Sequence, residues 1–286
     1  MQRHRDKKAV RRIWLTWILA IVFVISTLLA ALQLGAVYTM KSWGHWTPNY
    51  AKKNLQPVLE KQTLTEEDYA LLRRQTGLTK IGVDGLLEGG NIGRIYALQE
   101  LFFTPPELEI AHYTAFTYVE YMRQSLIFAN LVEGDIVLSA TTYTSGFRHG
   151  HAALVVDDEY PRILESYAPG MLSGISSLQG SMGRMANVLV LRPKCDKSVR
   201  AEVARRAKTE LVGLPFSVTV GVLSPKFVEK LQATQCAHIV WYAYKKYANI
   251  DLDGNGGAVI TPQDIFLSDQ VEVVQFYGFD PDRLWS

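Results

Sequence analysis

An α+β fold behind an N-terminal membrane helix is the fold class that the sequence predicts. Residues 13–40 form an apolar run without a charged residue, long enough to cross a bilayer because about 20 residues suffice. From Gly134 onward, short segments rich in Val, Ile and Leu are separated by Gly, Pro, Asp and Ser, which is typical of a largely antiparallel sheet. These segments precede two helices instead of alternating with helices, so a parallel βαβ arrangement is not expected.

The residues before the apolar run predict its orientation. Six of the 30 basic residues and one of the 28 acidic residues, Asp6, lie in residues 1–12. Because basic flanks stay inside the cell, we expect a cytoplasmic tail over 1–12, an anchor over 13–40 and an extracytoplasmic remainder. The basic residues are Arg3, Arg5, Lys7, Lys8, Arg11 and Arg12. The expected interfacial aromatic anchors are Trp14 and Trp17 at one edge, and Trp43, Trp46 and Tyr50 at the other.

A cleaved signal peptide is the alternative to an anchor. Its apolar core is normally about 7 to 15 residues long and ends at a small-x-small cleavage site. The run here is longer and lacks a clean site of that kind before Lys41, so an uncleaved anchor is favoured. The rest of the chain carries 24 basic and 27 acidic residues, a net charge of −3, without a clustered basic face. Nucleic-acid binding is therefore not expected.

Residues 41–130 are expected to form a small helical subdomain, and residues 131–286 a separate domain. Thr65 followed by three acidic residues, with Gly77 as a natural stop, predicts a helix over 66–76. A second helix is predicted over 94–103, ending before two prolines. Residues 85–93 are rich in glycine but lack the spacing of a phosphate loop, so a turn between helices is expected. Over 108–130 helix and strand signals compete.

Four strands and two helices are expected in the second domain. A helix capped by Ser198 and ending at Gly213 follows the strands, and a proline-containing loop leads to the last helix. The strand segments are GDIVLSA, HAALVV, RILESY and ANVLVLR, and the last helix begins in TQCAHIVWYAYKKY.

One of the two cysteines, Cys236, falls in the first turn of that last helix, with Thr234 as its cap. The unpaired N–H groups and the positive dipole end of a helix favour a thiolate, the form of cysteine that attacks a carbonyl carbon. Two alternatives stay open: a small buried apolar residue, and a disulfide with Cys195 in an oxidising compartment. The inward side of the helix is expected to carry Ile239, Val240, Ala243 and Tyr247.

A cysteine nucleophile needs a base, and the base needs a partner that holds its tautomer. His151, at the entrance to the AALVV strand, is the expected base, and His149 is the alternative. Glu165 lies on the next strand and can face the same side as His151 if the two strands form a hairpin. A purely structural histidine and an exposed glutamate are the alternatives. A metal site at the two histidines is disfavoured because further ligands at a recognisable spacing are missing.

The other four histidines are less suited to this role. His4 lies in the basic tail, His45 near the membrane, and His112 where helix and strand signals compete. His238 is two residues beyond Cys236 on the same helix, so we expect it to point away from the thiol.

The segment DLDGNGG offers a weak calcium candidate in Asp251, Asp253 and Asn255, which match the first half of a calcium-binding loop. The position that should supply a bidentate glutamate is Pro262, and Asp264 comes two residues late. A turn held by Asx side chains explains the segment equally well.

The segments GDIVLSATTYTSGFRHGHAALVV, ILESYAPG and TQCAHIVWYAYKKYANIDLDGNGGAVITPQDI resemble the circularly permuted papain-like cysteine hydrolases of the NlpC type. The most similar subgroup is the YiiX/YebB-like one, including membrane-anchored Gram-positive members. In that family the histidine strand comes first, an acidic or polar residue follows on the next strand, and the cysteine helix comes last. The resemblance covers roughly residues 131–278 and implies a permuted papain-like fold with an antiparallel sheet packed on the cysteine helix.

The resemblance implies Cys236 as nucleophile, His151 as base and Glu165 as the residue that orients it. Ala237 stands where the family usually has serine. The expected function is an extracytoplasmic cysteine peptidase or amidase, without a cofactor, that cleaves a cell-wall stem-peptide bond by acyl transfer. A lipid acyl hydrolase or acyltransferase is one alternative, because related permuted folds act on lipids. A non-catalytic wall-binding module is the other.

Overall fold

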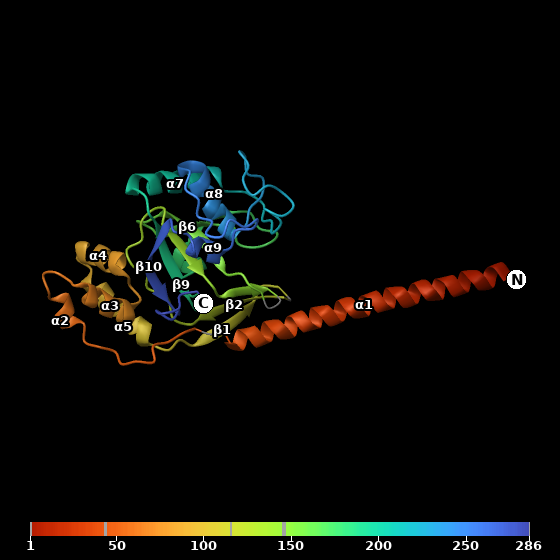
Figure 1. Ribbon diagram of the computed structural model, residues 1–286, viewed down its shortest axis with the longest axis horizontal. Helices are drawn as coiled ribbons and strands as arrows, with labels where there is room; N and C mark the ends of the chain where they lie inside the picture. Colours follow the sequence, from red (N-terminus) through yellow and green to blue (C-terminus); the bar gives the residue numbers. More distant parts are fainter. Residues whose placement is uncertain (1, 43–44, 115, 145–146, 286) are drawn as a thin grey trace.

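A single long helix, α1 (Gln2–Ser42), projects from the rest of the protein in the computed structural model, which describes residues 2–42, 45–114, 116–144 and 147–285 (Figure 1). Its segment Arg11–Gly35 is long and apolar enough to cross a membrane. No described residue of α1 belongs to the hydrophobic core, which is built from residues 46–285. Residues 45–286, called the body below, therefore have a complete hydrophobic core of their own and form a unit that folds without α1.

The N-terminal part of the body is helical up to Phe103. The predicted helix over 66–76 is confirmed as α3, with a capping box between Thr65 and Asp68 and a left-handed Gly77 at its end. The turn expected over 85–93 is shorter, since residues 85–88 complete α4 and only 89–91 form the turn. These helices are α2 (Gln56–Leu59), α3 (Glu66–Thr76), α4 (Lys80–Glu88) and α5 (Ile92–Phe103).

Residues 108–130, where sequence signals compete, contain two strands. These strands pair with two later ones in a four-stranded antiparallel sheet of order β1-β2-β4-β5. The region predicted as a helical subdomain over 41–130 therefore ends in strands that pair beyond that boundary. The strands are β1 (Leu108–His112), β2 (Thr117–Met122), β4 (Thr142–Thr144) and β5 (Phe147–Arg148).

A six-stranded sheet forms the centre of the body, and all its neighbouring strands are antiparallel, in the order β10-β9-β3-β6-β7-β8. The four strands predicted from the sequence are confirmed as β3, β6, β7 and β9. The near-continuous apolar runs of β3, β6 and β9 fit their complete burial. The bounds are β3 (Ile136–Ser139), β6 (His151–Asp157), β7 (Arg162–Glu165), β8 (Gly174–Ser177), β9 (Val188–Pro193) and β10 (Val271–Tyr277).

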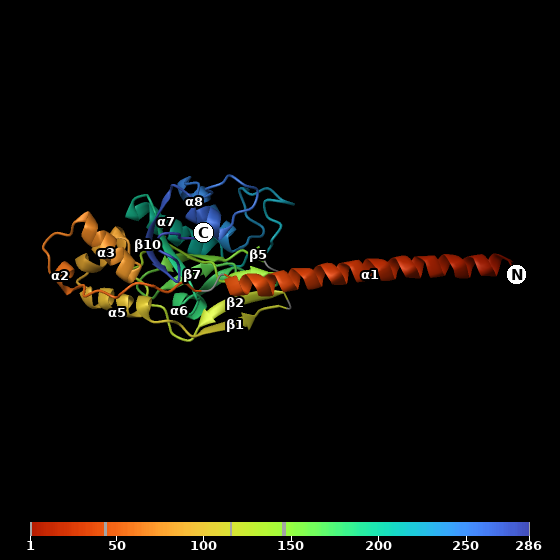
Figure 2. The same ribbon diagram turned by 60° about the horizontal axis from the view of Figure 1, so that its bottom comes forward.

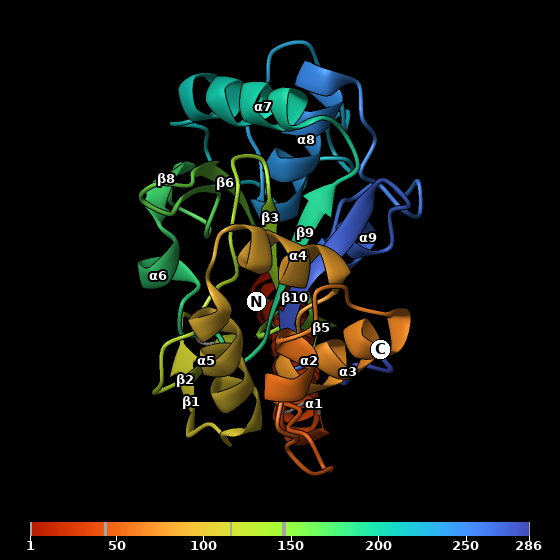
Figure 3. The same cartoon turned by 90° about the vertical axis from the view of Figure 1, so that its left-hand side faces the viewer.

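Helices α7 and α8 pack together and against β6, while α4 packs against β10 (Figure 3). The N-cap position of helix α7 is Asp196, without a side-chain cap bond, and the expected cap Ser198 lies within the helix. Helix α8 is buried from Cys236 to Tyr244. The remaining helices of the described chain are α6 (Leu178–Ser181), α7 (Lys197–Glu210), α8 (Cys236–Ala248) and α9 (Pro262–Phe266).

The connector after α1 is fixed to the body. The His45 ring donates to the carbonyl of Ala186, and the Trp46 ring packs 5.8 Å from that of Phe102. The Tyr50 hydroxyl donates to a backbone carbonyl of α3 at 2.6 Å. Trp46 and Tyr50 thus pack on the body, and their role as interfacial anchors stays a prediction, whereas Trp43 lies outside the described residues.

Candidate active site

Cys236 is the first residue of α8. The cap is Gln235 and not the expected Thr234: its side chain accepts from the backbone N–H of Ala237 at 2.9 Å. The same Gln235 oxygen lies 3.4 Å from the thiol of Cys236, which donates to it. The cap therefore holds the start of the helix and the sulfur together. The first N–H groups of a helix have no acceptor within it, and Gln235 takes that of Ala237, so the N–H of Cys236 is the candidate to bind a negative oxygen beside the sulfur.

His151 and Glu165 meet on neighbouring strands, as predicted. Their strands β6 and β7 form an antiparallel hairpin in which Leu154 lies opposite Leu164. Both side chains face the same side of the sheet, and the Nε2 atom of His151 lies 2.7 Å from Oε2 of Glu165. Both are buried, with 4% and 8% of their surfaces exposed. Because Nε2 is engaged by Glu165, Nδ1 is the ring nitrogen that remains for a second partner.

The surroundings of the His151 ring favour its protonated, positively charged form. Burial lowers its pKa, but hydrogen bonds with Cys236 and with Glu165 outweigh burial and raise that pKa to about 10. Cys236 therefore lies close enough to the ring to influence its pKa. The pKa of His151 in the folded protein lies above the usual value near 6.5. Protonation of the ring therefore stabilises the fold, and this contribution is complete below pH 6.5. That contribution is lost as the pH rises through about 10.

Glu165 is held by two serines that the sequence did not single out. Ser181 donates to Oε2 at 2.8 Å, and Ser176 donates to Oε1. Burial raises the pKa of Glu165, but the hydrogen bond from His151 and those from the two serines lower it below its usual value. The carboxylate therefore stays ionised beside the imidazolium. Ser176 could have been found only by predicting β8, a short strand that lacks apolar alternation.

The other two histidines near the site have structural partners. In His149, Nε2 lies 3.0 Å from the Thr144 hydroxyl and Nδ1 lies 3.0 Å from the Gly150 carbonyl. In His238, Nδ1 lies 2.9 Å from the Thr234 hydroxyl and Nε2 lies 2.8 Å from the Lys226 carbonyl. Burial lowers the pKa of both rings, which favours their neutral forms. Neither histidine shares the partners of His151.

A tyrosine cluster covers the open side of His151. The Tyr167 ring packs edge-on against the imidazole, with centroids 5.2 Å apart. Its hydroxyl donates to Tyr113, whose hydroxyl lies 2.9 Å from that of Tyr121. Burial and the hydrogen bond with Tyr113 raise the pKa of Tyr121 to about 12, so its hydroxyl stays protonated at neutral pH. Tyr167 lies two residues beyond Glu165 on the same side of the chain, a spacing from which it could have been found.

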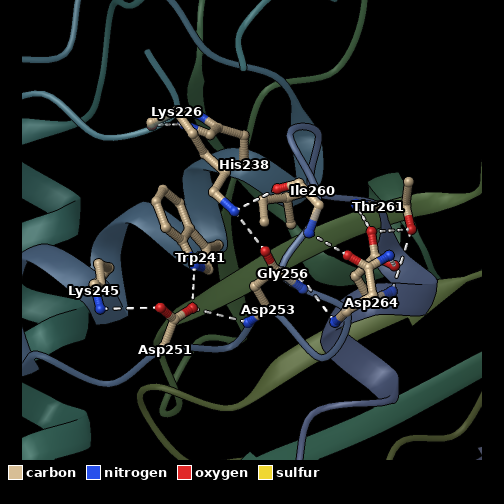
Figure 4. Close-up of polar contacts among 12 residues, drawn as sticks. Lys226, His238, Trp241, Lys245, Asp251, Asp253, Gly256, Ile260, Thr261 and Asp264 are labelled. Atoms are coloured by element: carbon tan, nitrogen blue, oxygen red, sulfur yellow. Dashed lines mark hydrogen bonds and ion pairs between the residues drawn. The ribbon is translucent and has the colours of Figure 1, made fainter. Parts of the chain in front are cut away.

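The proposed calcium residues are paired with protein groups (Figure 4). Asp251 accepts from the indole of Trp241 at 2.7 Å and from the ammonium of Lys245 at 3.0 Å. Asp253 accepts from the ammonium of Lys226 at 2.5 Å and from two backbone N–H groups of its own loop. Asn255 donates to Asp264. These partners favour the Asx turn, because they already neutralise the carboxylates that calcium would need.

Both cysteines are free thiols, so the disulfide alternative does not describe this structure. Cys195 lies before α7, beside Arg200, and is more exposed than Cys236. Burial raises the pKa of Cys195 above its usual value, while Arg200 acts in the opposite direction. Cys195 therefore provides an ordinary thiol in the same molecule with which Cys236 can be compared.

We predict that Gly150→Ala displaces the two flanking histidines. Gly150 has a φ of +70°, and a Cβ atom there would lie 2.3 Å from the carbonyl oxygen of Ser139, so the backbone must move. Gly170→Ala is the matched control, since its φ is +85° but nothing lies within 4 Å of the added atom. We expect alkylation of Cys236 to slow at least about tenfold in Gly150→Ala, which corresponds to about 1.4 kcal/mol of free energy lost when His151 is misplaced. In Gly170→Ala we expect little change in the rate. Equal rates in both variants would contradict the placement of His151 by this turn.

No family model matches this chain, and no curated protein matches it. Among solved structures it is similar to the crystal structure of the metalloprotein yiiX from Escherichia coli O157:H7. The match covers 51% of this chain and 97% of that chain, with 14% sequence identity and a TM-score of 0.39. At these values it is a weak hint of a YiiX-like fold and assigns neither a family nor an activity.

Proposed function

We propose that this protein is a membrane-anchored cysteine hydrolase with a permuted papain-like fold, which works by acyl transfer to Cys236. The observation that carries the proposal is the buried pair of His151 and Glu165, whose side chains lie 2.7 Å apart, together with the influence of Cys236 on the pKa of the His151 ring. A buried histidine linked to both a thiol and a carboxylate has the roles that nucleophilic catalysis by cysteine requires. We further propose that α1 is an uncleaved anchor and that the body lies outside the cytoplasm.

In the proposed mechanism, Glu165 holds Nε2 of His151 and leaves Nδ1 toward the sulfur. A cationic imidazole beside Cys236 stabilises the thiolate, which attacks the carbonyl carbon of the substrate. The backbone N–H of Cys236, at the positive end of α8, supports the oxyanion. His151 then donates its proton to the leaving group, and the resulting thioester is hydrolysed by water that the neutral ring deprotonates.

The proposal is tested first without a substrate, by alkylating both free thiols with iodoacetamide and counting the modified cysteines by peptide mass spectrometry. We expect Cys236 to react at neutral pH at least about tenfold faster than Cys195, because a cationic His151 beside the sulfur would favour the thiolate strongly enough to offset burial. His151→Ala should remove that advantage. A wild-type protein in which the buried Cys236 reacts more slowly than Cys195 would point to a non-catalytic binding module.

A further inference from the structure

Two exposed aromatic side chains lie where strands of the four-stranded sheet begin. Phe116, directly before β2, is 38% exposed, and Phe147, the first residue of β5, is 65% exposed. Thr117 lies opposite Thr144, which in turn lies opposite Phe147, so the two phenylalanines lie at one end of this sheet. The chain carries no charged residue over 113–119 or over 136–147.

The loop between α7 and α8 forms a second apolar projection. Residues 211–225 contain no charged residue, and Val218, Val222 and Leu223 are 67%, 63% and 80% exposed. The loop is joined to the start of α8, because the backbone of Ser217 donates to the carbonyl of Thr234 at 2.7 Å. Leu172, 61% exposed, pairs with Pro215 in the same loop. We call Phe116, Phe147, Leu172, Val218, Val222 and Leu223 the site face.

The candidate active site lies between these two projections. On one side, Tyr113 at the β1–β2 hairpin tip accepts from Tyr167, whose ring packs on His151. On the other side, the apolar loop is joined to Thr234, two residues before Cys236. An exposed apolar surface of this kind normally marks a protein-binding, ligand-binding or membrane-binding site.

The far end of the six-stranded sheet has the opposite character. Strand β6 runs from His151 to Asp157, so its far end lies about 20 Å from the site at the usual rise per residue. That end carries Asp157, Asp158 and Glu159, followed by Tyr160. A surface cavity of ≈ 990 Å³ lined by Asp158 and Tyr160 lies at this far end, and not at Cys236. The segments that carry the site face are uncharged, in contrast to this far end of β6.

Helix α1, as the proposed anchor, places the bilayer close to the end of the body that holds the candidate active site. Only residues 43 and 44 separate α1 from His45, which is bound to Ala186, so the end of α1 lies within about 11 Å of the body. Ala186 in turn donates to the carbonyl of Glu120 on β2, three residues from the tip of that strand at Thr117. Figures 1 and 2 show the β1–β2 hairpin and the α7–α8 loop projecting toward the side on which α1 leaves the body.

From this geometry we propose that the site face inserts into the surface of the bilayer that α1 spans, and that the substrate is an acyl lipid in that bilayer. The proposal rests on the proposed function of Cys236. The thiolate attacks the acyl carbonyl, the bond from the carbonyl carbon to the leaving oxygen or nitrogen breaks, and His151 gives its proton to the leaving group. Water then breaks the carbon–sulfur bond, which releases a fatty acid and restores the thiolate. Uncharged apolar tips suit the boundary between headgroups and acyl chains.

The first arm of the test measures membrane binding. Residues 45–286 are mixed with phosphatidylcholine vesicles and floated through a sucrose gradient. We expect the wild-type body to float and the double variant Val222→Ser/Leu223→Ser to lose at least about tenfold in partitioning, because two side chains no longer leave water. Tyr160→Ser is the matched control, 71% exposed at the far end of β6, and should float like the wild type.

The second arm measures the reaction and separates the two possible substrate classes. Phosphatidylcholine vesicles and soluble muropeptides are supplied in turn, and fatty acid release, peptide cleavage and acylation of Cys236 are followed by mass spectrometry. Fatty acid release that requires Cys236 and falls in Val222→Ser/Leu223→Ser, with unchanged cleavage of a soluble p-nitrophenyl ester, supports the proposal. Cleavage of muropeptides without lipid, or fast alkylation of Cys236 with neither flotation nor fatty acid release, overturns it while the proposed cysteine chemistry stands. If Cys236 does not react with iodoacetamide, the lipid proposal and the proposed cysteine chemistry are both contradicted.

Discussion

Cys236→Ala is expected to abolish cleavage of a soluble p-nitrophenyl ester, and His151→Ala is expected to lower kcat/KM by about 10²- to 10⁴-fold. The first change removes the atom that forms the thioester. The second removes the ring that meets both Cys236 and Glu165. Glu165→Gln should cause a smaller loss, because the amide can still accept from Nε2 although it no longer carries a charge. The release of p-nitrophenol measures all three variants.

His149→Ala tests the assignment of the base. The His149 ring is engaged by the Thr144 hydroxyl and the Gly150 carbonyl, so its loss should leave most of the ester cleavage intact. If His149→Ala were more damaging than His151→Ala, the base would have to be reassigned. Cleavage that survives in Cys236→Ala would remove the acyl-transfer scheme altogether.

Arg192→Leu is expected to destabilise the body by about 3–5 kcal/mol, because it leaves a buried carboxylate without its charged partner. Asp135, fully buried at the start of β3, accepts from Arg192 of β9 at 2.8 Å and 2.7 Å. Asp135 also accepts from the backbone N–H of Val132 at 2.9 Å. The ion pair therefore joins the residue before β3 to the neighbouring strand β9. Urea unfolding of residues 45–286, followed by tryptophan fluorescence, gives the change in the free energy of unfolding.

The double variant Asp135→Asn/Arg192→Leu separates the ion pair from general packing. Without the carboxylate the missing guanidinium matters less, so we expect the double variant to recover a substantial part of the loss. If its destabilisation equals the sum of the two single changes, the pair contributes no coupling and the explanation is wrong.

The central sheet could be predicted from the sequence because its strands are strongly apolar and are separated by turn residues. The hairpin of β6 and β7 followed from the DDEYP turn, and the helix over 66–76 from its capping box. The four-stranded sheet could not be predicted, because β1 is exposed along most of its length and β4 and β5 are only a few residues long. Their pairing depends on contacts between segments far apart in the chain.

The proximity of His151 and Glu165 could be predicted from strand alternation, whereas their surroundings could not. Ser176, Ser181 and Tyr167 reach the site only through the register of β7, β8 and the following turn. The cap of α8 was also misassigned: Thr234 bonds to the ring of His238, and Gln235, a less usual cap, holds the helix start. Such choices between neighbouring polar residues depend on packing that the local sequence does not specify.

The pH dependence of Cys236 alkylation tests the central claim most directly. The proposed mechanism places a cationic His151 beside a thiolate, so it predicts an alkylation rate at Cys236 that changes little between about pH 6.5 and 9. Over the same range the rate at Cys195, whose pKa is raised by burial, should climb steeply with pH. In His151→Ala, Cys236 should behave like Cys195. A Cys236 rate that climbs with pH in the wild type as it does at Cys195 would contradict the paired thiolate and imidazolium on which the proposed function depends.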